Sequence, residues 1–253
     1  MIPAPVEYVR PASLEEALAE LADPDAKAIA GGHSLVPLMK LRLARPSRIV
    51  DLAPLGLRGV ALEDGTLRIG ALTTYDELLS SPARLPDALR ECAEAVGDVQ
   101  VRNAGTIGGA LAHGDPASDF AAGAIATGAT LVLRSIDGSR EVAAGEFFLG
   151  PFTTALGQQE LLVELRVPPP APGEGSAYVA FADPASGYPL AGAAVQVAAD
   201  GGVRIGLSGV GATPLLVEGD VEAAVDQLGL DDHRRQLVLV AVARATARAR
   251  ERT

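Results

Sequence analysis

The seventeen residues from Asn103 to Asp119, N-A-G-T-I-G-G-A-L-A-H-G-D-P-A-S-D, constrain the fold more than any other stretch of the chain. Five of them are glycine or proline, most of the others are small, and no apolar period of a helix or a strand runs through them. The pattern predicts a long loop. Because glycine has no Cβ, the backbone of such a loop approaches a large polar ligand closely. Long loops inside compact domains are usually functional, so we expect a binding site here.

A shorter glycine turn of the same kind, A-G-G-H-S, lies upstream at Ala30–Ser34. It follows a predicted strand over 26–30 and precedes a predicted short helix, which Ser34 would cap and which has Pro37 in its first turn. Backbone amides at the start of a helix point outward and favour a phosphate group. Neither glycine segment has G-x-G-x-x-G or G-x-x-x-x-G-K-S/T spacing, which excludes the plain Rossmann and P-loop signatures.

Two interpretations of the glycine segments remain open at this point. In the first, each glycine pair is a tight turn that needs a left-handed backbone and nothing more. In the second, backbone amides of both segments bind one pyrophosphate from two sides. Ser34 and Thr106 would then add hydroxyl donors, and Asp119 would accept from a ribose hydroxyl. Amides carry no net charge, so the second interpretation is compatible with an acidic chain.

Composition excludes several classes of function. The 253 residues include 21 basic and 32 acidic ones, and the net charge of -11 disfavours a nucleic-acid-binding protein, which needs a basic face. A single cysteine, Cys92, rules out a disulfide within the chain and any cluster held by several cysteines, and its apolar surroundings predict a core position. The segment Met1–Pro5 lacks the pattern of a signal peptide. No apolar stretch is long enough to span a membrane. We therefore expect a cytoplasmic protein.

The order of predicted elements indicates an α+β protein of three units. Ser13–Glu16 and Thr74–Glu77 have the pattern of capping boxes, and a hairpin is expected around 63–66. The run P-P-P-A-P-G-E-G at 168–175 is the clearest break in the chain. The units expected on this basis are residues 1–55, residues 56–170 and residues 176–253. The third should contain an antiparallel meander over 176–182, 191–199 and 203–210, followed by helices over 221–228 and 233–250.

The two glycine segments also carry a resemblance to a known family. Ala30–Ser34 is followed by L-V-P-L-M-K-L-R-L, and the T-I-G-G at Thr106–Gly109 is followed from Leu111 by L-A-H-G-D-P-A-S-D. Together they resemble the FAD-binding medium subunit of the molybdenum hydroxylases, of the carbon monoxide dehydrogenase and xanthine dehydrogenase type, within the vanillyl-alcohol-oxidase-like (PCMH-type) FAD fold. Further matching residues are Gly150-Pro151, Glu160–Leu162, 187–191 and 205–211, so the resemblance covers nearly the whole chain.

The resemblance implies two α/β FAD-binding subdomains (1–55 and 56–170) and a C-terminal domain of antiparallel sheet and helices (176–253). It implies that both glycine segments hold the FAD pyrophosphate, that Lys27 approaches the adenine side and that Asp119 holds a ribose hydroxyl. Leu161 or Leu162 would line the cofactor, and Tyr188 would lie near the isoalloxazine. The full set of expected cofactor-binding residues is Lys27, Ala30, Gly31, Gly32, His33, Ser34, Leu35, Thr106, Ile107, Gly108, Gly109, Ala110, His113, Asp115, Asp119, Leu161, Leu162 and Tyr188.

Several of these residues have a second interpretation. His33 and His113 invite a metal site, but two ligands without a third make a poor one, and a hydrogen bond to backbone or flavin is the expectation. Asp115 is expected to cap a helix that follows Pro116. Ala110 stands where the family has an asparagine, and the segment 181–186 lacks the family's basic residue and carries Asp183 instead. These two departures bear on FAD affinity and on the electron acceptor.

The function implied is an FAD-dependent oxidoreductase subunit of a dehydrogenase complex. It would relay electrons from partner iron–sulfur and molybdopterin subunits to an acceptor such as NAD, a quinone or oxygen. The redox chemistry belongs to the cofactor, so no catalytic acid or base is named. One alternative is a stand-alone FAD-dependent oxidase or dehydrogenase acting on a small organic substrate. A second is a degenerate scaffold subunit that has lost its flavin.

Overall fold

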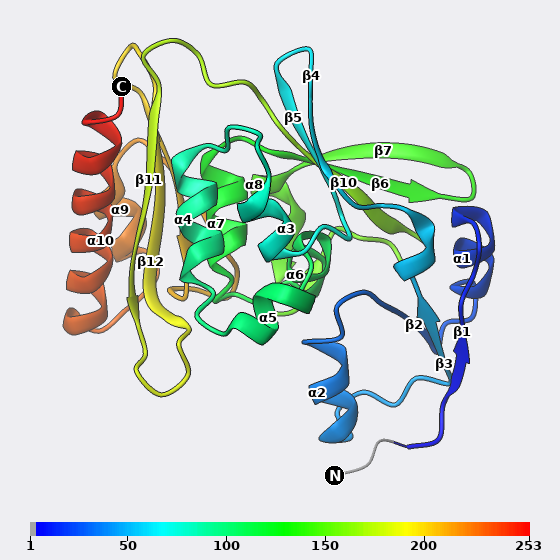
Figure 1. The fold of residues 1–253 in the computed structure, drawn as a ribbon. Helices are drawn as coiled ribbons and strands as arrows, with labels where there is room; N and C mark the ends of the chain where they lie inside the picture. Colours follow the sequence, from blue (N-terminus) through cyan, green and yellow to red (C-terminus); the bar gives the residue numbers. More distant parts are fainter. Residues whose placement is uncertain (1–3) are drawn as a thin grey trace.

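The computed structural model describes residues 4–253. The first three residues, part of the N-terminal segment in which no signal-peptide pattern was found, lie outside the described part. Within that part the strands form sheets of three, five and four strands and one short two-stranded ribbon, with helices packed between and outside them (Figure 1). The α+β class predicted from the sequence is confirmed.

The N-terminal sheet is parallel and has the order β1-β3-β2. Ser13 caps the first helix by accepting the Glu16 amide at 3.1 Å, but the Glu16 carboxylate accepts from the Ala12 amide, one residue before the position that a capping box requires. The elements are β1 (Glu7–Val9), α1 (Leu14–Glu20), β2 (Ala26–Ile29), α2 (Leu35–Lys40), β3 (Arg48–Asp51) and a 3-10 turn, η1 (Ala53–Leu55).

The central sheet is antiparallel, in the order β4-β5-β10-β6-β7. The predicted hairpin at 63–66 forms, with Asp64 and Gly65 both in the left-handed region. The complete capping box of Thr74 and Glu77 begins α3. Strand β7 was not predicted, because it is almost wholly exposed and has no apolar face. The strands are β4 (Val60–Glu63), β5 (Thr66–Gly70), β6 (Thr130–Ser135), β7 (Gly138–Ala143) and β10 (Leu161–Val167).

Helices fill the space beside the central sheet. The prediction of a long loop over 103–119 was wrong, because much of that stretch is helical. Thr106 accepts the Gly109 amide at 3.1 Å to begin α6, and Gly114 ends it at φ 66°. Ile107, Gly108 and Leu111 form its buried face, and two large apolar side chains among small residues were too few to show a helical period. A Cβ on Gly108 would lie 2.5 Å from the Cβ of Ala71, so the helix packs closely there. The elements are α3 (Tyr75–Ser80), α4 (Asp87–Ala95), α5 (Val99–Ala104), α6 (Ile107–His113), α7 (Asp119–Ala126), α8 (Ala144–Phe147), β8 (Phe148–Gly150) and β9 (Thr153–Thr154).

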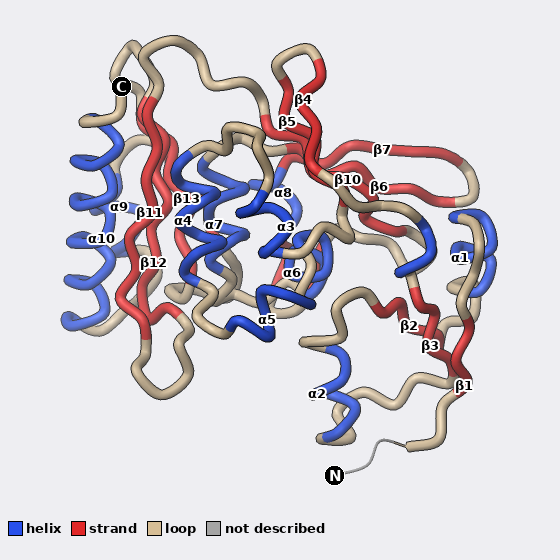
Figure 2. Tube along the Cα trace, viewed as in Figure 1, coloured by secondary structure: helices blue, strands red, loops and turns tan. Residues whose placement is uncertain are grey.

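The C-terminal sheet is the predicted antiparallel meander, extended by one short strand that was not predicted. Helix α10 packs on one face, and α4 and α7 pack on the other (Figures 1 and 2). The approach of α7 requires glycine, because a Cβ on Gly206 would lie 2.0 Å from the carbonyl oxygen of Ala122. The elements are β11 (Gly175–Ala182), β12 (Pro189–Val197), β13 (Val203–Ser208), β14 (Leu215–Glu218), α9 (Val221–Asp226) and α10 (Asp232–Arg250).

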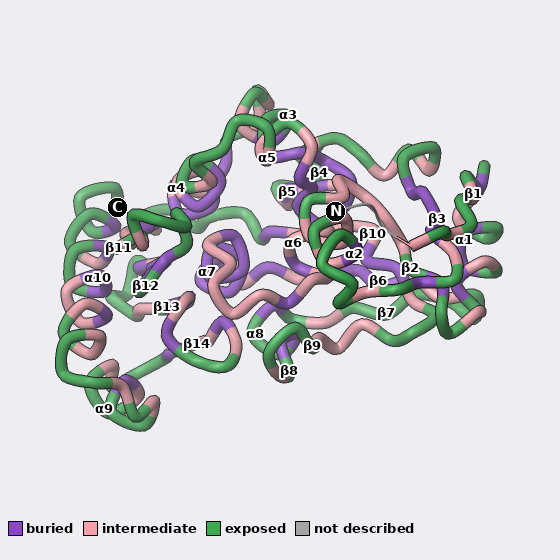
Figure 3. The backbone as a smooth tube through the Cα atoms, turned by 90° about the horizontal axis from the view of Figure 1, so that it is seen from below, coloured by how far each residue is buried: buried purple, intermediate pink, exposed green. Residues whose placement is uncertain are grey.

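The hydrophobic core lies around α7, whose residues 120–126 are all buried (Figure 3). Cys92 packs there with no exposed surface, as the sequence predicted. Tyr178 and Ala194 from the C-terminal sheet belong to the same core cluster as the central sheet. Leu161, on the central sheet, belongs to the cluster of the N-terminal sheet. Because these cores cross the predicted borders, the division into three units stays a prediction. In residues 4–253, no helix combines the length and apolarity that crossing a membrane requires.

Candidate cofactor site

A cavity of about 940 Å³ opens where the N-terminal sheet, the helices α5–α7 and the β11–β12 connection meet. Its size lies at the upper end of the roughly 300–1,000 Å³ that is usual for ligand sites. Every expected cofactor-binding residue except Ile107 lines it. Ile107 is fully buried in the core, where it supports α6 from behind. The fold therefore brings together residues that lie up to about 160 positions apart in the sequence, from Lys27 to Tyr188.

The segment Ala30–Ser34 forms one wall of the cavity. Within the described residues, the amides of Gly31, Gly32, His33 and Ser34 have no hydrogen-bond partner. Gly32 is in the left-handed region at φ 72°. Ser34 precedes α2, as predicted, but its side chain does not cap that helix, so its hydroxyl is available as well. This wall therefore presents a row of neutral donors of the kind that binds phosphate oxygens.

Gly31 is where the two glycine segments touch. A Cβ at this position would lie 1.9 Å from the carbonyl oxygen of Ala104 and 2.9 Å from the Cα of Gly105. Only glycine permits this approach, because both neighbours are backbone atoms that have no rotamer through which to move away. The A-G-G turn thus has a packing reason beyond its backbone conformation, which the sequence pattern did not reveal.

The second glycine segment contributes fewer amides than expected. Four of its amides donate within the fold: Ile107 to Thr73 O (2.9 Å), Gly108 to Ala71 O (2.8 Å), Gly109 to Thr106 Oγ1 (3.1 Å) and Ala110 to Thr106 O (3.0 Å). These four amides are engaged within the fold, and the expectation that backbone amides of this segment help to clasp a pyrophosphate stays a prediction. Thr106 Oγ1 accepts from Gly109 and still has its own proton to donate toward the cavity.

Asp119 is a half-buried carboxylate on the cavity wall. It is the first residue of α7, where Ser118 provides the cap by accepting the Ala121 amide at 3.3 Å. Oδ1 accepts a hydrogen bond from the Tyr178 hydroxyl. Burial raises the pKa of Asp119 to about 6, and the Tyr178 hydrogen bond acts in the opposite direction. Asp115 does not cap α7, contrary to the prediction, because it closes a local turn by accepting the Ala117 amide at 2.9 Å.

The two histidines have different surroundings. His113 packs against Phe152 with the two rings tilted and 5.1 Å between their centroids, and burial lowers its pKa, which favours the neutral ring. His33 lies exposed on the opposite wall. In residues 4–253 no group of three or more His, Cys, Asp or Glu side chains has a metal-binding arrangement. Phe152 was missed by the sequence reasoning, although it follows the matching Gly150-Pro151 and holds a left-handed backbone at φ 53°.

The connection between β11 and β12 closes one side of the cavity with Tyr188. Asp183 accepts the amides of Ala185 (2.7 Å) and Ser186 (3.1 Å) and shapes this turn. Burial raises the pKa of the Tyr188 phenol. Other lining residues, which were not among the expected cofactor-binding residues, come from three connections beside the cavity: Val96, Gly97, Asp98, Phe152, Gln158 and Glu160.

These residues fit an elongated dinucleotide such as FAD. Free amides and the Ser34 hydroxyl suit a pyrophosphate, the Asp119 carboxylate suits a ribose hydroxyl, and Leu161 and Leu162 supply an apolar wall. The free amides and the Ser34 hydroxyl are neutral donors, so a phosphate site made of them is compatible with the net negative charge of the chain. The arrangement contains no nucleophile–base pair, so it is suited to holding a cofactor.

Comparison with known proteins agrees with this geometry. Residues 4–170 match the family described as FAD binding domain in molybdopterin dehydrogenase. The chain is 45% identical over 229 residues to the carbon monoxide dehydrogenase medium chain of Hydrogenophaga pseudoflava, covering 87% of this chain and 79% of that one. It is 40% identical over 245 residues to the medium chain from Afipia carboxidovorans, covering 91% and 85%.

Solved structures give the same result over the full length. A carbon monoxide dehydrogenase from Hydrogenophaga pseudoflava, which lacks the Mo-pyranopterin moiety of its cofactor, contains a chain that superposes with a TM-score of 0.90 at 40% identity and covers 98% of both chains. Quinoline 2-oxidoreductase from Pseudomonas putida 86 gives a TM-score of 0.85 at 30% identity and 99% coverage of both. The chain therefore belongs to the family of FAD-binding domains of molybdopterin dehydrogenases, as its motifs predicted, and FAD is its cofactor.

Proposed function

We propose that the chain is the FAD-carrying subunit of a molybdenum-hydroxylase-type dehydrogenase and that it relays electrons from partner subunits to an acceptor. The observation that carries the proposal is the cavity itself, a dinucleotide-sized site with free amides on one wall and the half-buried Asp119 carboxylate on another. Since the whole sequence has one cysteine, buried in the core, this chain cannot hold a cysteine-ligated cluster, and the electrons must come from another chain.

The residues of the chain act by holding and shielding the cofactor. The amides of Gly31–Ser34, with the hydroxyls of Ser34 and Thr106, bind the pyrophosphate, and Asp119 accepts from a ribose hydroxyl. Leu161 and Leu162 exclude water from the flavin side, and Tyr188 lies at the isoalloxazine. FAD, when bound, supplies the electron-transfer chemistry, and the protein sets its position and surroundings.

The partners in this proposal are an iron–sulfur subunit and a molybdopterin subunit. Several relatives are described as one chain of a larger dehydrogenase: the medium chain of carbon monoxide dehydrogenase and the beta subunit of the caffeine dehydrogenase of a Pseudomonas species. This chain spans 85% of the Afipia carboxidovorans medium chain, so it is comparable in extent to one subunit of such a complex. The final acceptor is NAD, a quinone or oxygen, and the complex works in the cytoplasm.

Purification of the tagged full chain from the cells that produce it tests this proposal. We expect a yellow protein with one FAD per chain, accompanied by stoichiometric molybdenum- and iron-containing chains. Adding the substrate of the complex should bleach the flavin only when the partner chains are present. A yellow protein that purifies alone and is reduced directly by a small organic substrate would identify a stand-alone flavoenzyme. A colourless chain that takes up no added FAD would contradict the proposal at its first step.

A further inference from the structure

We propose that Tyr178, on the first strand of the C-terminal sheet, is a positioning residue for the FAD site, which it serves by holding the Asp119 carboxylate. The inference rests on the proposed function, because it takes Asp119 as a ligand of the cofactor. It differs from that function by assigning a task to a residue outside the cavity. Tyr178 does not line the cavity and is 4% exposed, and its hydroxyl donates to Oδ1 of Asp119.

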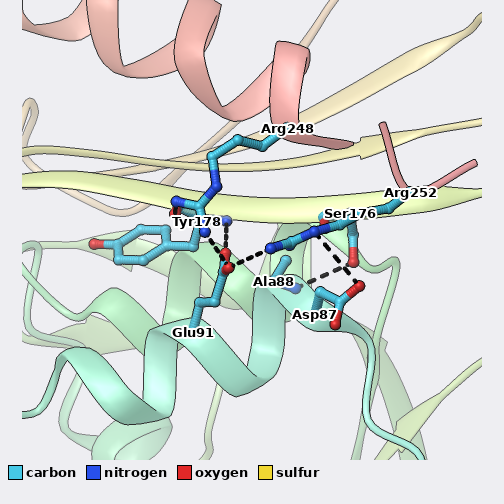
Figure 4. A network of polar contacts seen from close by, with 7 residues as sticks. All are labelled: Asp87, Ala88, Glu91, Ser176, Tyr178, Arg248 and Arg252. Atoms are coloured by element: carbon cyan, nitrogen blue, oxygen red, sulfur yellow. Dashed lines mark hydrogen bonds and ion pairs between the residues drawn. The ribbon is translucent and has the colours of Figure 1, made fainter. Parts of the chain in front are cut away.

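The backbone of Tyr178 is fixed from two directions, as Figure 4 shows. Its amide donates to Oε2 of Glu91 on α4 at 2.6 Å, and its carbonyl accepts from Arg248 on α10 at 3.2 Å. Glu91 in turn binds both Arg248 and Arg252. The phenol ring extends away from the two arginines (Figure 4). A residue anchored at its backbone and bonded at its hydroxyl holds its partner with little freedom of its own.

The C-terminal sheet also leaves room for this hydroxyl. Gly192, the neighbour on β12, would place a Cβ 2.4 Å from the Tyr178 oxygen and 2.4 Å from the Ser208 oxygen. Gly192 has no left-handed backbone angle that would by itself require glycine. Its role is therefore to admit the phenol oxygen, and any larger residue would push Tyr178 away from Asp119.

The ionised form of Asp119 depends on the hydrogen bond from Tyr178, because of the kind of side chains that surround the carboxylate. The titratable side chains that influence or are influenced by Asp119 are Asp115, Tyr75 on α3, Cys92 on α4, Tyr188 and Tyr178. None of them carries a positive charge in any protonation state. Of the interactions that favour the ionised carboxylate, only the Tyr178 hydrogen bond comes from a side chain, and the other comes from the Asp119 amide. Without Tyr178, Asp119 would take up a proton at a higher pH and lose strength as an acceptor.

The substitution Tyr178→Phe tests this inference in the full chain, because it keeps the ring and removes the hydroxyl. We expect the dissociation constant of FAD, measured on protein stripped of its flavin, to rise about tenfold, in line with the loss of one hydrogen bond to a charged group. The pH below which FAD affinity falls should also move upward. Tyr8→Phe is the matched control, since it removes a tyrosine–aspartate bond (2.5 Å, to Asp51) between residues that do not line the cavity.

Two further measurements keep the test decisive. The pKa of Asp119, followed by NMR in the flavin-free protein, should rise in Tyr178→Phe and stay constant in Tyr8→Phe, a change that a purely structural loss would not produce. In an Asp119→Asn background, Tyr178→Phe should weaken FAD binding much less than in the wild type. Equal FAD affinity and equal Asp119 pKa in Tyr178→Phe and Tyr8→Phe would overturn the inference. Failure of the wild-type protein to bind FAD would instead overturn the proposed function.

Discussion

At the scale of single residues, the role proposed for Asp119 requires an ionised carboxylate, whereas the surroundings of this side chain disfavour the ionised form. It begins α7, whose remaining residues are all buried, and its half-buried carboxylate loses part of its hydration there. Its pKa of about 6, against a usual 3.8, means that the folded chain without FAD holds this proton more tightly than the unfolded chain does. A site that needs an acceptor at this position therefore lowers the stability of the free protein.

We predict that Asp119→Asn stabilises the flavin-free protein. The native state binds more protons than the unfolded state between pH 3.8 and about 6, so the contribution of this group to stability falls as pH rises through that window and stays low above it. The free-energy gain of the variant should reach about 3 kcal/mol at pH 8 and be clearly smaller at pH 4.5. Urea unfolding of both proteins at the two pH values measures it. A gain of the same size at both values would show that burial of the charge is not its cause.

At the scale of secondary-structure elements, local signals were predictable and packing signals were not. The capping box at Thr74–Glu77 and the hairpin at 63–66 are encoded in neighbouring residues, and both form. Helix α6 was missed because Ile107 and Leu111 are the two large apolar residues of its buried face, and two such residues among glycine and alanine do not establish a hydrophobic period. Strands β7 and β14 were missed for a related reason, the first being exposed and the second only four residues long.

The candidate site likewise has features that the sequence predicted and features that it did not. The glycine motifs identified both segments that line the cavity, because their spacing and neighbours are specific. The sequence could not predict which backbone amides are hydrogen-bonded within the fold, since this depends on partners distant in the chain, such as Thr73 and Ala71. Phe152 and Tyr178 likewise depend on tertiary neighbours. The roles assigned to single lining residues, Lys27 and Tyr188 among them, stay predictions.

Two arginines near the C-terminus, Arg248 on α10 and Arg252 just after it, form ion pairs within the molecule. Arg248 and Arg252 both pair with Glu91 on α4, whose side chain is 17% exposed (Figure 4). We predict that Glu91→Ala destabilises the protein by about 3 kcal/mol, because it removes the carboxylate that two guanidinium groups share and leaves the Tyr178 amide without its partner. Asp226→Ala, which removes the more exposed pair with Arg235, should cost about 0–1 kcal/mol. Denaturant unfolding compares the two, and equal losses would contradict an internal role for Glu91.

At the scale of the whole molecule, three separate sheets contribute to one cavity. Lys27 to Leu35 come from the N-terminal sheet and the turn after it, Leu161 and Leu162 come from the central sheet, and Tyr188 comes from the C-terminal one. The glycine contacts Gly31–Ala104 and Gly206–Ala122 bring the backbones of these parts together. A ligand in the cavity therefore contacts all three parts at once and adds its binding energy to their association.

We predict that FAD binding stabilises all three parts of the chain together. At a free FAD concentration of 100 times the dissociation constant, the free energy of unfolding should rise by about 2.7 kcal/mol, since a ligand that binds only the folded state shifts the unfolding equilibrium by mass action. Amide hydrogen exchange should slow in three separate segments, 31–34, 106–119 and 183–188. Riboflavin, which lacks the pyrophosphate, is the control and should leave 31–34 unprotected. If one FAD molecule contacts all three parts of the cavity, each of the three segments should gain order when it binds. Protection of only one segment would therefore contradict the prediction.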